Sequence, residues 1–317
     1  MKKLLVPVLA GMVTAGLLSG PAMAQGKKTL AFVTNGSADF WTIARRGTEK
    51  AAKELPNYKV EFDIPSQATA ASQKRLLDDL LTRGVAGVSI STINPANSTA
   101  ELNKVASKAV LFSTDSDAPA SKRIVYIGTD NFASGVQAGH ELKKVLPNGG
   151  DVMMFVGSMD NDNAIQRVNG IRKAIAGTKI KILGIRTDQL DAVAAKRNVE
   201  DTLAKYPHIA GLVGIYSYNT PQIYNAVKAA GKAGKVKIIG FDEDPQTLRG
   251  VADGTVYATI VQQPFQFGYQ CMMDMAKYIQ GDRSFIPANH QIIIPTRIID
   301  KSNVKGFQGF MQKLLKG

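Results

Sequence analysis

Several short apolar runs of the sequence end in side chains that suit a hydroxyl-rich ligand. Asp115, Asp242 and Gln262 each follow such a run, and Asn163 and Arg167 lie four residues apart after another. A carboxylate accepts hydrogen bonds from two adjacent hydroxyls, an arginine donates several, and the charges strengthen each bond. These residue types predict a binding site for a polyhydroxylated molecule.

Two aromatic side chains extend this pattern. Phe40 and Trp41 follow the first apolar run, where their flat rings suit the C–H faces of a sugar. Each feature alone has another interpretation, because an aspartate after a strand is often a helix cap and an aromatic pair is often part of a core. Asn163 and Arg167 alone fit a surface pair on a helix. Their joint position at the ends of several predicted strands favours ligand binding.

The segments that carry these residues alternate between strand-like and helix-like patterns. Short runs rich in β-branched residues alternate with longer segments whose apolar residues recur at helical spacing. The first set has predicted strands at 29–34, 58–64, 86–90 and 109–113, and predicted helices at 40–55, at 72–83 and through Leu102 and Val105. This order is typical of βαβ units, which form a parallel sheet with helices on both faces.

A second set of the same kind starts after about Thr129. Its predicted helices are 134–145, 163–176, 192–205, 221–230 and 265–279, and its predicted strands are 151–156, 179–185, 210–215, 236–241, 256–261 and 291–294. We therefore expect two α/β lobes. The ligand is expected in a cleft between them, at the carboxyl ends of the strands.

The first 24 residues have the build of an export signal. Lys2 and Lys3 precede an uncharged, mostly apolar run at 4–18, and the segment ends in Ala22-Met23-Ala24. The run is too short to cross about 30 Å of hydrocarbon as a helix. The pattern is typical of a secretory signal peptide with an A-x-A cleavage site. We expect cleavage after Ala24 and a mature protein in the bacterial periplasm.

The remaining composition argues against several other classes of protein. The net charge is +13, but the basic residues are scattered, which favours a solvated surface over a nucleic-acid site. Cys271 is the only cysteine, so no intramolecular disulfide forms. The histidines lack metal-ligand spacing, and the common nucleotide-binding and hydrolase motifs are missing. Asp115 and Asp242 fit hydroxyl acceptors better than a catalytic pair. We expect no enzymatic activity, metal, cofactor or nucleic-acid partner.

Six short motifs resemble those of the periplasmic monosaccharide-binding proteins of ABC importers, which include ribose-, xylose- and galactose-binding proteins. They are Phe40-Trp41, DSDAP at 115–119, IGTDN at 127–131, NAIQR at 163–167, IGFDEDP at 239–245 and TIVQQP at 259–264. The resemblance extends from about Lys28 to Pro295. It implies the type I periplasmic binding protein or Venus-flytrap fold, an α/β fold of two doubly wound parallel-sheet lobes joined by a three-stranded hinge.

The resemblance also implies how the chain is divided. After the signal peptide at 1–24, residues 25–129 plus 263–291 would form the N-terminal lobe, and 130–262 plus 292–317 the C-terminal lobe. The chain would cross between lobes near 129–131, 262–264 and 291–295. The tail after residue 295 ends in a predicted short helix at 307–315.

The resemblance assigns roles to particular positions. In the ribose-binding branch the positions of Phe40, Trp41, Asp115, Arg167, Asp242 and Gln262 contact the sugar, and the galactose-binding branch adds the position of Asn163. This chain departs from the ribose pattern at Ala38, Ser116, Leu190 and Tyr216, so a pentose, a related hexose and a short polyol all remain open. Further candidate contacts are Asn35, Ser37, Ser116, Leu190, Tyr216 and Asn219.

These features predict an extracytoplasmic solute-binding protein that works as a monomer. It would capture a monosaccharide or polyol in the cleft and deliver it to an ABC transporter permease. A chemotaxis receptor or an autoinducer-binding protein of the same fold is the alternative, and DSD at 115–117 is also similar to the autoinducer-binding branch. Sugar-responsive repressors share the core but begin with a DNA-binding helix-turn-helix, where this chain has an export signal.

Overall fold

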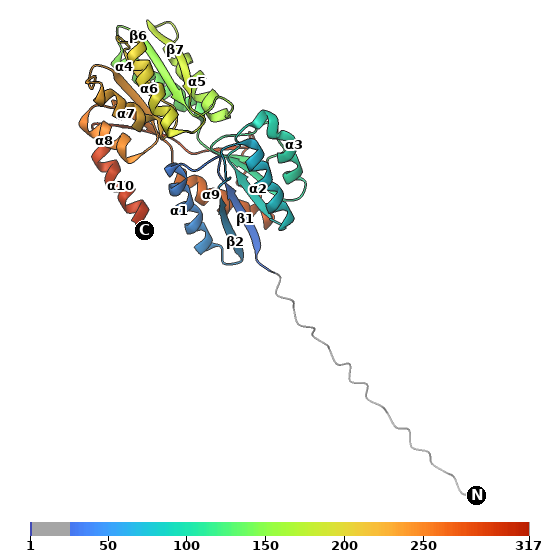
Figure 1. Cartoon of the computed structure of the whole chain (residues 1–317). Coiled ribbons are helices and arrows are strands. Elements are labelled where there is room, and N and C mark those ends of the chain that lie inside the picture. The colour runs from blue at the N-terminus through green and yellow to red at the C-terminus, as the bar shows by residue number, and fades with distance from the viewer. Residues whose placement is uncertain (2–25, 317) are drawn as a thin grey trace.

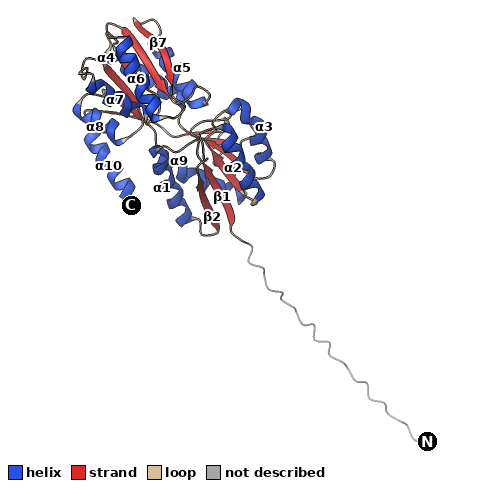
Figure 2. Ribbon diagram, in the orientation of Figure 1, coloured by secondary structure: helices blue, strands red, loops and turns tan. Residues whose placement is uncertain are grey.

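The computed structural model describes residue 1 and residues 26–316, so the predicted signal peptide lies, apart from Met1, outside the described residues. The described chain forms two α/β lobes, each built on a six-stranded sheet with helices on both faces (Figures 1 and 2). The predicted α/β fold with two largely parallel sheets is confirmed.

The first sheet is entirely parallel and has the strand order β11-β5-β4-β3-β1-β2. Its strands are β1 (Lys28–Val33), β2 (Tyr58–Asp63), β3 (Gly87–Ile90), β4 (Val110–Thr114), β5 (Val125–Gly128) and β11 (Gln291–Ile293). The central strands are almost wholly buried, because helices cover both faces. One face packs against α1 (Asp39–Glu54) and α9 (Pro264–Ile279), and the other against α2 (Ala70–Thr82) and α3 (Pro95–Ala106).

The second sheet repeats this plan in the order β12-β10-β9-β8-β6-β7, with β12 antiparallel to β10. Its strands are β6 (Gly150–Val156), β7 (Ile180–Thr187), β8 (Gly211–Gly214), β9 (Lys237–Phe241), β10 (Ala258–Val261) and β12 (Arg297–Asp300). One face packs against α4 (Asn131–Val145) and α5 (Asp162–Ile175). The other packs against α6 (Ala192–Lys205), α7 (Asn219–Ala229), α8 (Pro245–Asp253) and α10 (Val304–Lys316).

The two sheets therefore correspond strand for strand. The position of β4 in the first sheet is the position of β9 in the second, and β5 corresponds to β10. Asp115 follows β4 directly, and Asp242 follows β9 directly. The two aspartates are thus equivalent residues of the two lobes.

The chain passes between the lobes three times. It leaves the first sheet after β5 at 129–130, returns after β10 at 262–263, and leaves again after β11 at 294–296. β11 ends at Ile293, so its pairing in the first sheet continues two residues past the predicted boundary at 291. The side-chain amide of Gln263 donates to the carbonyl oxygen of Pro295 at 2.8 Å, which joins two of the three connecting segments.

Three elements were not predicted: β5, α8 and β12. The start and end of α8 are nevertheless marked in the sequence. Asp244 accepts hydrogen bonds from the first backbone N–H groups, Pro245 occupies the first turn, and Gly254 has a φ of 81° at the end. The apolar pattern of this nine-residue helix is too short to predict it from the sequence.

The cores bury part of the C-terminal helix and the single cysteine. The predicted tail helix is α10, and its Phe307 and Met311 are buried in the core of the second lobe, which Ile43 of α1 joins from the first lobe. Cys271 of α9 is buried in the core of the first lobe, and this burial raises the pKa of its thiol to about 12.

Candidate ligand-binding site between the lobes

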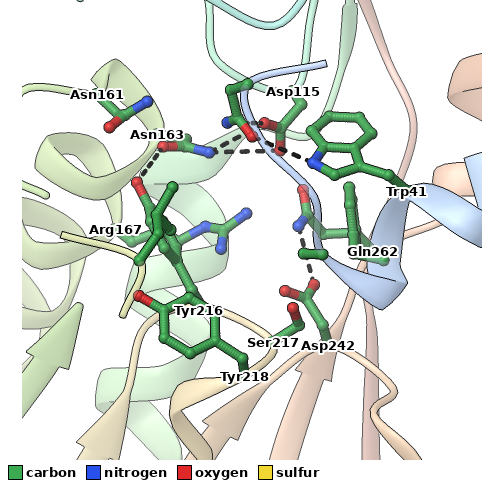
Figure 3. A pocket seen from close by; sticks show the side chains of 14 residues that line it. Trp41, Asp115, Asn161, Asn163, Arg167, Tyr216, Ser217, Tyr218, Asp242 and Gln262 are labelled. Carbon is green, nitrogen blue, oxygen red and sulfur yellow. Dashed lines mark hydrogen bonds between the residues drawn. The ribbon is translucent and has the colours of Figure 1, made fainter. Parts of the chain in front are cut away.

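A pocket of about 450 Å³, measured with its open mouth, lies where the carboxyl ends of the two sheets meet. Figure 3 shows its polar side chains converging from both lobes. All seven principal candidates line it, and so do three of the further candidates, Asn35, Leu190 and Tyr216. The complete lining is Asn35, Ala38, Phe40, Trp41, Asp115, Asn161, Asn163, Arg167, Leu190, Tyr216, Ser217, Tyr218, Asp242 and Gln262.

The two equivalent aspartates have the same unusual backbone. Asp115 has a φ of 56° and Asp242 a φ of 67°, in the left-handed region that aspartate enters more readily than most residues. Each conformation is held through the aspartate's own carbonyl oxygen. Tyr126 and Asn131 donate to that of Asp115 at 3.1 and 3.0 Å, and Thr259 donates to that of Asp242 at 2.8 Å. These bonds turn each carboxylate into the pocket.

Asp115 is the acceptor at the centre of a network that spans both lobes. Its Oδ2 accepts from the hydroxyl of Ser91 at 2.7 Å and from the amide of Asn35 at 3.4 Å. The amide of Asn163, from the second lobe, donates to both carboxylate oxygens at 3.3 and 3.2 Å (Figure 3). Burial raises the pKa of Asp115, while the charge of Arg167 and these hydrogen bonds oppose the rise.

Arg167 is the one cation among the pocket-lining residues, and it is 1 % exposed. Its Nε donates to Oδ1 of Asn131 at 2.9 Å, and its Nη1 donates to the carbonyl of Ile215 at 2.9 Å. The guanidinium lies 4.7 Å from the ring centroid of Phe241. The buried Nη2 has no hydrogen-bond partner among the described residues. A buried N–H donor without a partner is costly, which makes Nη2 a donor for a ligand.

Gln262 and Asp242 form a hydrogen-bonded pair beside the segment at 262–263, where the chain returns to the first lobe. Nε2 of Gln262 donates to Oδ1 of Asp242 at 2.9 Å, which orients the amide so that Oε1 is free. This Oε1 is buried and has no partner within residues 26–316. Burial raises the pKa of Asp242 to about 6, with Arg167 and Gln262 opposing the rise. The pocket therefore offers a free acceptor close to a carboxylate.

The aromatic pair lies at the N-terminal end of α1. Trp41 is 3 % exposed, and its indole N–H donates to Oδ1 of Asn35 at 3.1 Å. Phe40 meets Trp41 edge to face, with ring centroids 4.9 Å apart. Both rings also belong to the core of the first lobe, so the core interpretation of this pair holds as well. They form an apolar wall of the pocket.

The opposite wall comes from the loops of the second lobe. The hydroxyl of Tyr216 donates to Oδ1 of Asn163 at 3.1 Å, which fixes the orientation of that amide. The hydroxyl of Tyr218 donates to the buried carboxylate of Asp188, which also accepts from the amide of Asn219 at 2.9 Å. Desolvation raises the pKa of both tyrosines, so their hydroxyls stay protonated.

Three candidates lie outside the pocket lining. Ser37 is exposed, Ser116 is fully buried, and Asn219 is held by Asp188 and supports the wall from behind. Neighbours at a strand end or helix start point in different directions, so proximity in sequence to a lining residue does not by itself place a side chain in the pocket.

Sequence reasoning did not include Ala38, Asn161, Ser217 and Tyr218 among the candidate contacts, although they line the pocket. Asn161 is the residue directly before α5 and lies two residues before Asn163, so the polar run Asp160–Asn163 carried a usable signal. The position of Tyr218 depends on its bond to Asp188, which is 30 residues away in sequence, and no local pattern indicates that pairing.

No three His, Cys, Asp or Glu side chains in the described part of the chain are grouped so as to hold a metal ion. None of the helices in residues 26–316 is long and apolar enough to cross a membrane.

The chain was compared with known families, proteins and structures. Residues 30–283 match the family described as "Periplasmic binding protein domain". The ribose import binding protein RbsB of Haemophilus influenzae is 30% identical over 300 residues, which cover 92% of this chain and 99% of that protein. The D-allose-binding periplasmic protein of Escherichia coli is 25% identical over 269 residues, 82% of this chain and 86% of that protein.

Solved structures give the same result. GanP, a glucose-galactose binding protein from Geobacillus stearothermophilus, superposes with a TM-score of 0.82 at 28% identity and covers 88% of this chain and 99% of its own. An ABC transporter solute-binding protein from Burkholderia graminis in complex with D-arabinose gives a TM-score of 0.83 at 25% identity, with coverage of 89% and 98%.

The matched family consists of non-enzymatic solute-binding proteins, in agreement with the prediction that the chain is not an enzyme. The match covers most of the chain, and the resemblance noted from the six motifs is confirmed. This chain therefore belongs to the periplasmic binding protein domain family.

Proposed function

We propose that the chain is exported, that residues 1–24 are removed after Ala24, and that the mature monomer captures a monosaccharide or short polyol in the periplasm. It then delivers this ligand to the permease of an ABC transporter. The proposal is supported by relatives named for binding ribose and allose and by a solved relative in complex with D-arabinose.

One observation carries the proposal. The pocket contains a buried donor without a partner, Nη2 of Arg167, and a buried acceptor without a partner, Oε1 of Gln262, when only the described residues are counted. Two carboxylates, Asp115 and Asp242, lie in the same pocket. A ligand with several adjacent hydroxyls satisfies donors and acceptors together, because each hydroxyl both donates and accepts.

The arrangement also supports capture by closure of the lobes. The lining is divided between them: Trp41 and Asp115 come from the first lobe, and Asn163, Arg167 and Asp242 from the second. A ligand that contacts both lobes binds the closed form more tightly than the open form, so it shifts the population towards closure. The three connecting segments would supply the hinge.

The test is binding of a panel of pentoses, hexoses, tetritols and autoinducer to the mature chain, by thermal shift and then calorimetry. A ligand at 100 times its dissociation constant stabilises the folded form by about 2.7 kcal/mol. For the ligand found, Arg167→Ala and Asp242→Ala each lose on the order of 1.5–3 kcal/mol of binding free energy, because each removes a charge-assisted hydrogen bond.

Exposed residues of the same types provide the controls. Arg172→Ala and Asp201→Ala change surface side chains of the same lobe and leave binding unchanged. Wild-type affinity in both Arg167→Ala and Asp242→Ala would refute the pocket as the binding site. If the chain binds autoinducer in preference to every sugar and polyol, the proposed function becomes that of a signal receptor and no longer that of a sugar-transport protein.

A further inference from the structure

The loop between β7 and α6 has an unusual conformation at the mouth of the pocket. Gln189 and Leu190 are consecutive non-glycine residues with positive φ, 54° and 64°. A branched side chain is rare in this region and persists only where its surroundings hold it. Leu190 is 37 % exposed and lines the pocket, so the strained residue is the one at the rim.

Asp188 holds this loop. Its side chain is 3 % exposed, and its Oδ1 accepts from the backbone N–H of Leu190 at 3.0 Å. The same carboxylate accepts from the hydroxyl of Tyr218 and from the amide of Asn219. The backbone N–H of Gln189 donates to the carbonyl of Gly157 at 2.8 Å. One buried carboxylate thus fixes Leu190 and Tyr218, which both line the pocket.

The methyl groups of Leu190 reach both lobes. A Cβ built on Gly36, in the first lobe, would lie 3.4 Å from one methyl, and a Cβ built on Gly157, in the second lobe, would lie 2.7 Å from the other. The absence of a side chain at Gly157 therefore makes room for Leu190. The residue covers the mouth of the cleft from one lobe to the other.

This side of the pocket has no free hydrogen-bond donor from its tyrosines. The hydroxyl hydrogen of Tyr218 is committed to Asp188, and that of Tyr216 is committed to Asn163. The free donor and acceptor described above are on Arg167 and Gln262, not on these two tyrosines. A ligand hydroxyl packed against the methyl groups of Leu190 would give up hydrogen bonds to water and gain none from Leu190, which is costly.

Sugar chemistry then restricts what can lie there. The C–H faces of an aldopyranose suit the aromatic wall of Phe40 and Trp41. Carbons 1 to 4 each carry a hydroxyl at the ring edge, so the edge position that can meet methyl groups without losing a hydrogen bond is carbon 5. We propose that Leu190 determines which sugars bind, an inference that rests on the proposed function. The pocket selects sugars that carry hydrogen or methyl at carbon 5 and rejects those that carry hydroxymethyl. The preferred ligands are pentopyranoses and 6-deoxyhexoses, with Asp188 as the positioning residue.

Sugars that differ only in the substituent at carbon 5 test this directly. D-arabinose, L-fucose and L-galactose form one series with hydrogen, methyl and hydroxymethyl, and D-xylose, 6-deoxy-D-glucose and D-glucose form another. D-ribose, 6-deoxy-D-allose and D-allose, and L-arabinose, D-fucose and D-galactose, complete the set. In the series that binds, we expect calorimetry to show that the members with hydrogen or methyl bind about 10- to 100-fold more tightly than the member with hydroxymethyl. This is the loss of affinity expected when a ligand brings an extra hydroxyl into an apolar site.

Leu190→Asn is the decisive variant, because asparagine tolerates positive φ and supplies both a donor and an acceptor. It shifts the affinity ratio towards the hydroxymethyl sugar by about tenfold or more. Val193→Asn, at an exposed apolar position three residues later, leaves the ratio unchanged. Tyr218→Phe, which removes one bond to Asp188, lowers the wild-type preference, whereas a purely structural role would weaken all three sugars of a series equally.

The outcomes separate this inference from the proposed function. Tight binding of one series with no preference among its members, or an unchanged ratio in Leu190→Asn, overturns the role of Leu190 and leaves sugar capture standing. Failure of every sugar and polyol to bind overturns the proposed function, and this inference falls with it.

Discussion

The side-chain amide of Asn163, on α5 of the second lobe, donates to both carboxylate oxygens of Asp115, at the end of β4 in the first lobe, at 3.3 and 3.2 Å. The hydroxyl of Tyr216 holds the same amide from the other side, because it donates to Oδ1 of Asn163. The two lobes are thus joined by a direct polar contact in the middle of the proposed site.

Replacing this amide should weaken binding. Asn163→Ala removes both donors to Asp115 and leaves a buried carboxylate with fewer partners, so we expect a loss of about 1.5–3 kcal/mol in binding free energy. Calorimetry with the ligand found in the panel measures it. Asn148→Ala, at an exposed turn, is the matched control. An affinity within twofold of wild type in Asn163→Ala would show that the contact is dispensable.

Binding should also depend on pH through Asp242. Burial raises the pKa of this carboxyl to about 6, and protonation removes the negative charge and turns one acceptor oxygen into a donor, which weakens its bonds to ligand hydroxyls. Affinity therefore falls as the pH is lowered through about 6 and is constant well above it. Calorimetry between pH 5 and 8 gives the profile. Asp242→Asn loses affinity at neutral pH and has a flatter profile, because the titrating group at this position is gone. A wild-type profile that is flat over this range would contradict the assignment.

The next residue, Glu243, should make the stability of the protein depend on pH. Both of its carboxylate oxygens are buried without a partner in the described part of the protein, and burial raises its pKa well above the usual value. Because the folded-state pKa is raised, the contribution of Glu243 to stability is fully present below about pH 4.3, its unfolded value, and is lost as the pH rises through the folded value.

Glu243→Gln keeps the shape and removes the charge. We expect its free energy of unfolding to exceed that of wild type by roughly 1–3 kcal/mol at pH 7.5 and to match it near pH 4. Urea denaturation at the two pH values measures both differences. Glu200→Gln, at an exposed helical position, should change neither. Equal stabilities of wild type and Glu243→Gln at pH 7.5 would mean that Glu243 has a partner in solution.

The C-terminal helix provides a matched pair of phenylalanines. Phe307 is 8 % exposed and packs in the core of the second lobe, whereas Phe310, three residues later, is 45 % exposed. Phe307→Ala should lower the free energy of unfolding by about 3 kcal/mol, since it leaves a cavity. Phe310→Ala should cost less than about 1 kcal/mol, the contribution expected from its contact with Arg297. Thermal or urea denaturation measures both losses. Equal losses in the two variants would contradict the burial of Phe307 in the core of the second lobe.

The sequence predicted the two-lobe architecture because its strands are short, apolar and regularly separated by helices. Where the pattern was weak, the prediction failed. β12 has only four residues and is partly exposed, and its place beside β10 is set by long-range pairing rather than by local preference. β5 is equally short, and it overlaps the IGTDN motif, whose polar residues do not fit a strand pattern.

The candidate pocket was predictable to the extent that its residues follow strands directly. Asp115, Asp242 and Gln262 do so, and the parallel sheet brings such residues together without further information. Ser116 shows the limit, because it adjoins Asp115 but is buried away from the pocket. The wall formed by Tyr218 and Leu190 depends on Asp188, which acts through tertiary hydrogen bonds that no spacing rule describes.

The solitary thiol of Cys271 has a practical consequence. Since it is sealed inside the first lobe and strongly disfavours the reactive thiolate, maleimide dyes added to the native protein would leave it untouched. New cysteines on the rims of the two lobes can then be labelled without first removing the natural one. The protein can therefore be converted into a fluorescent sensor for its own ligand.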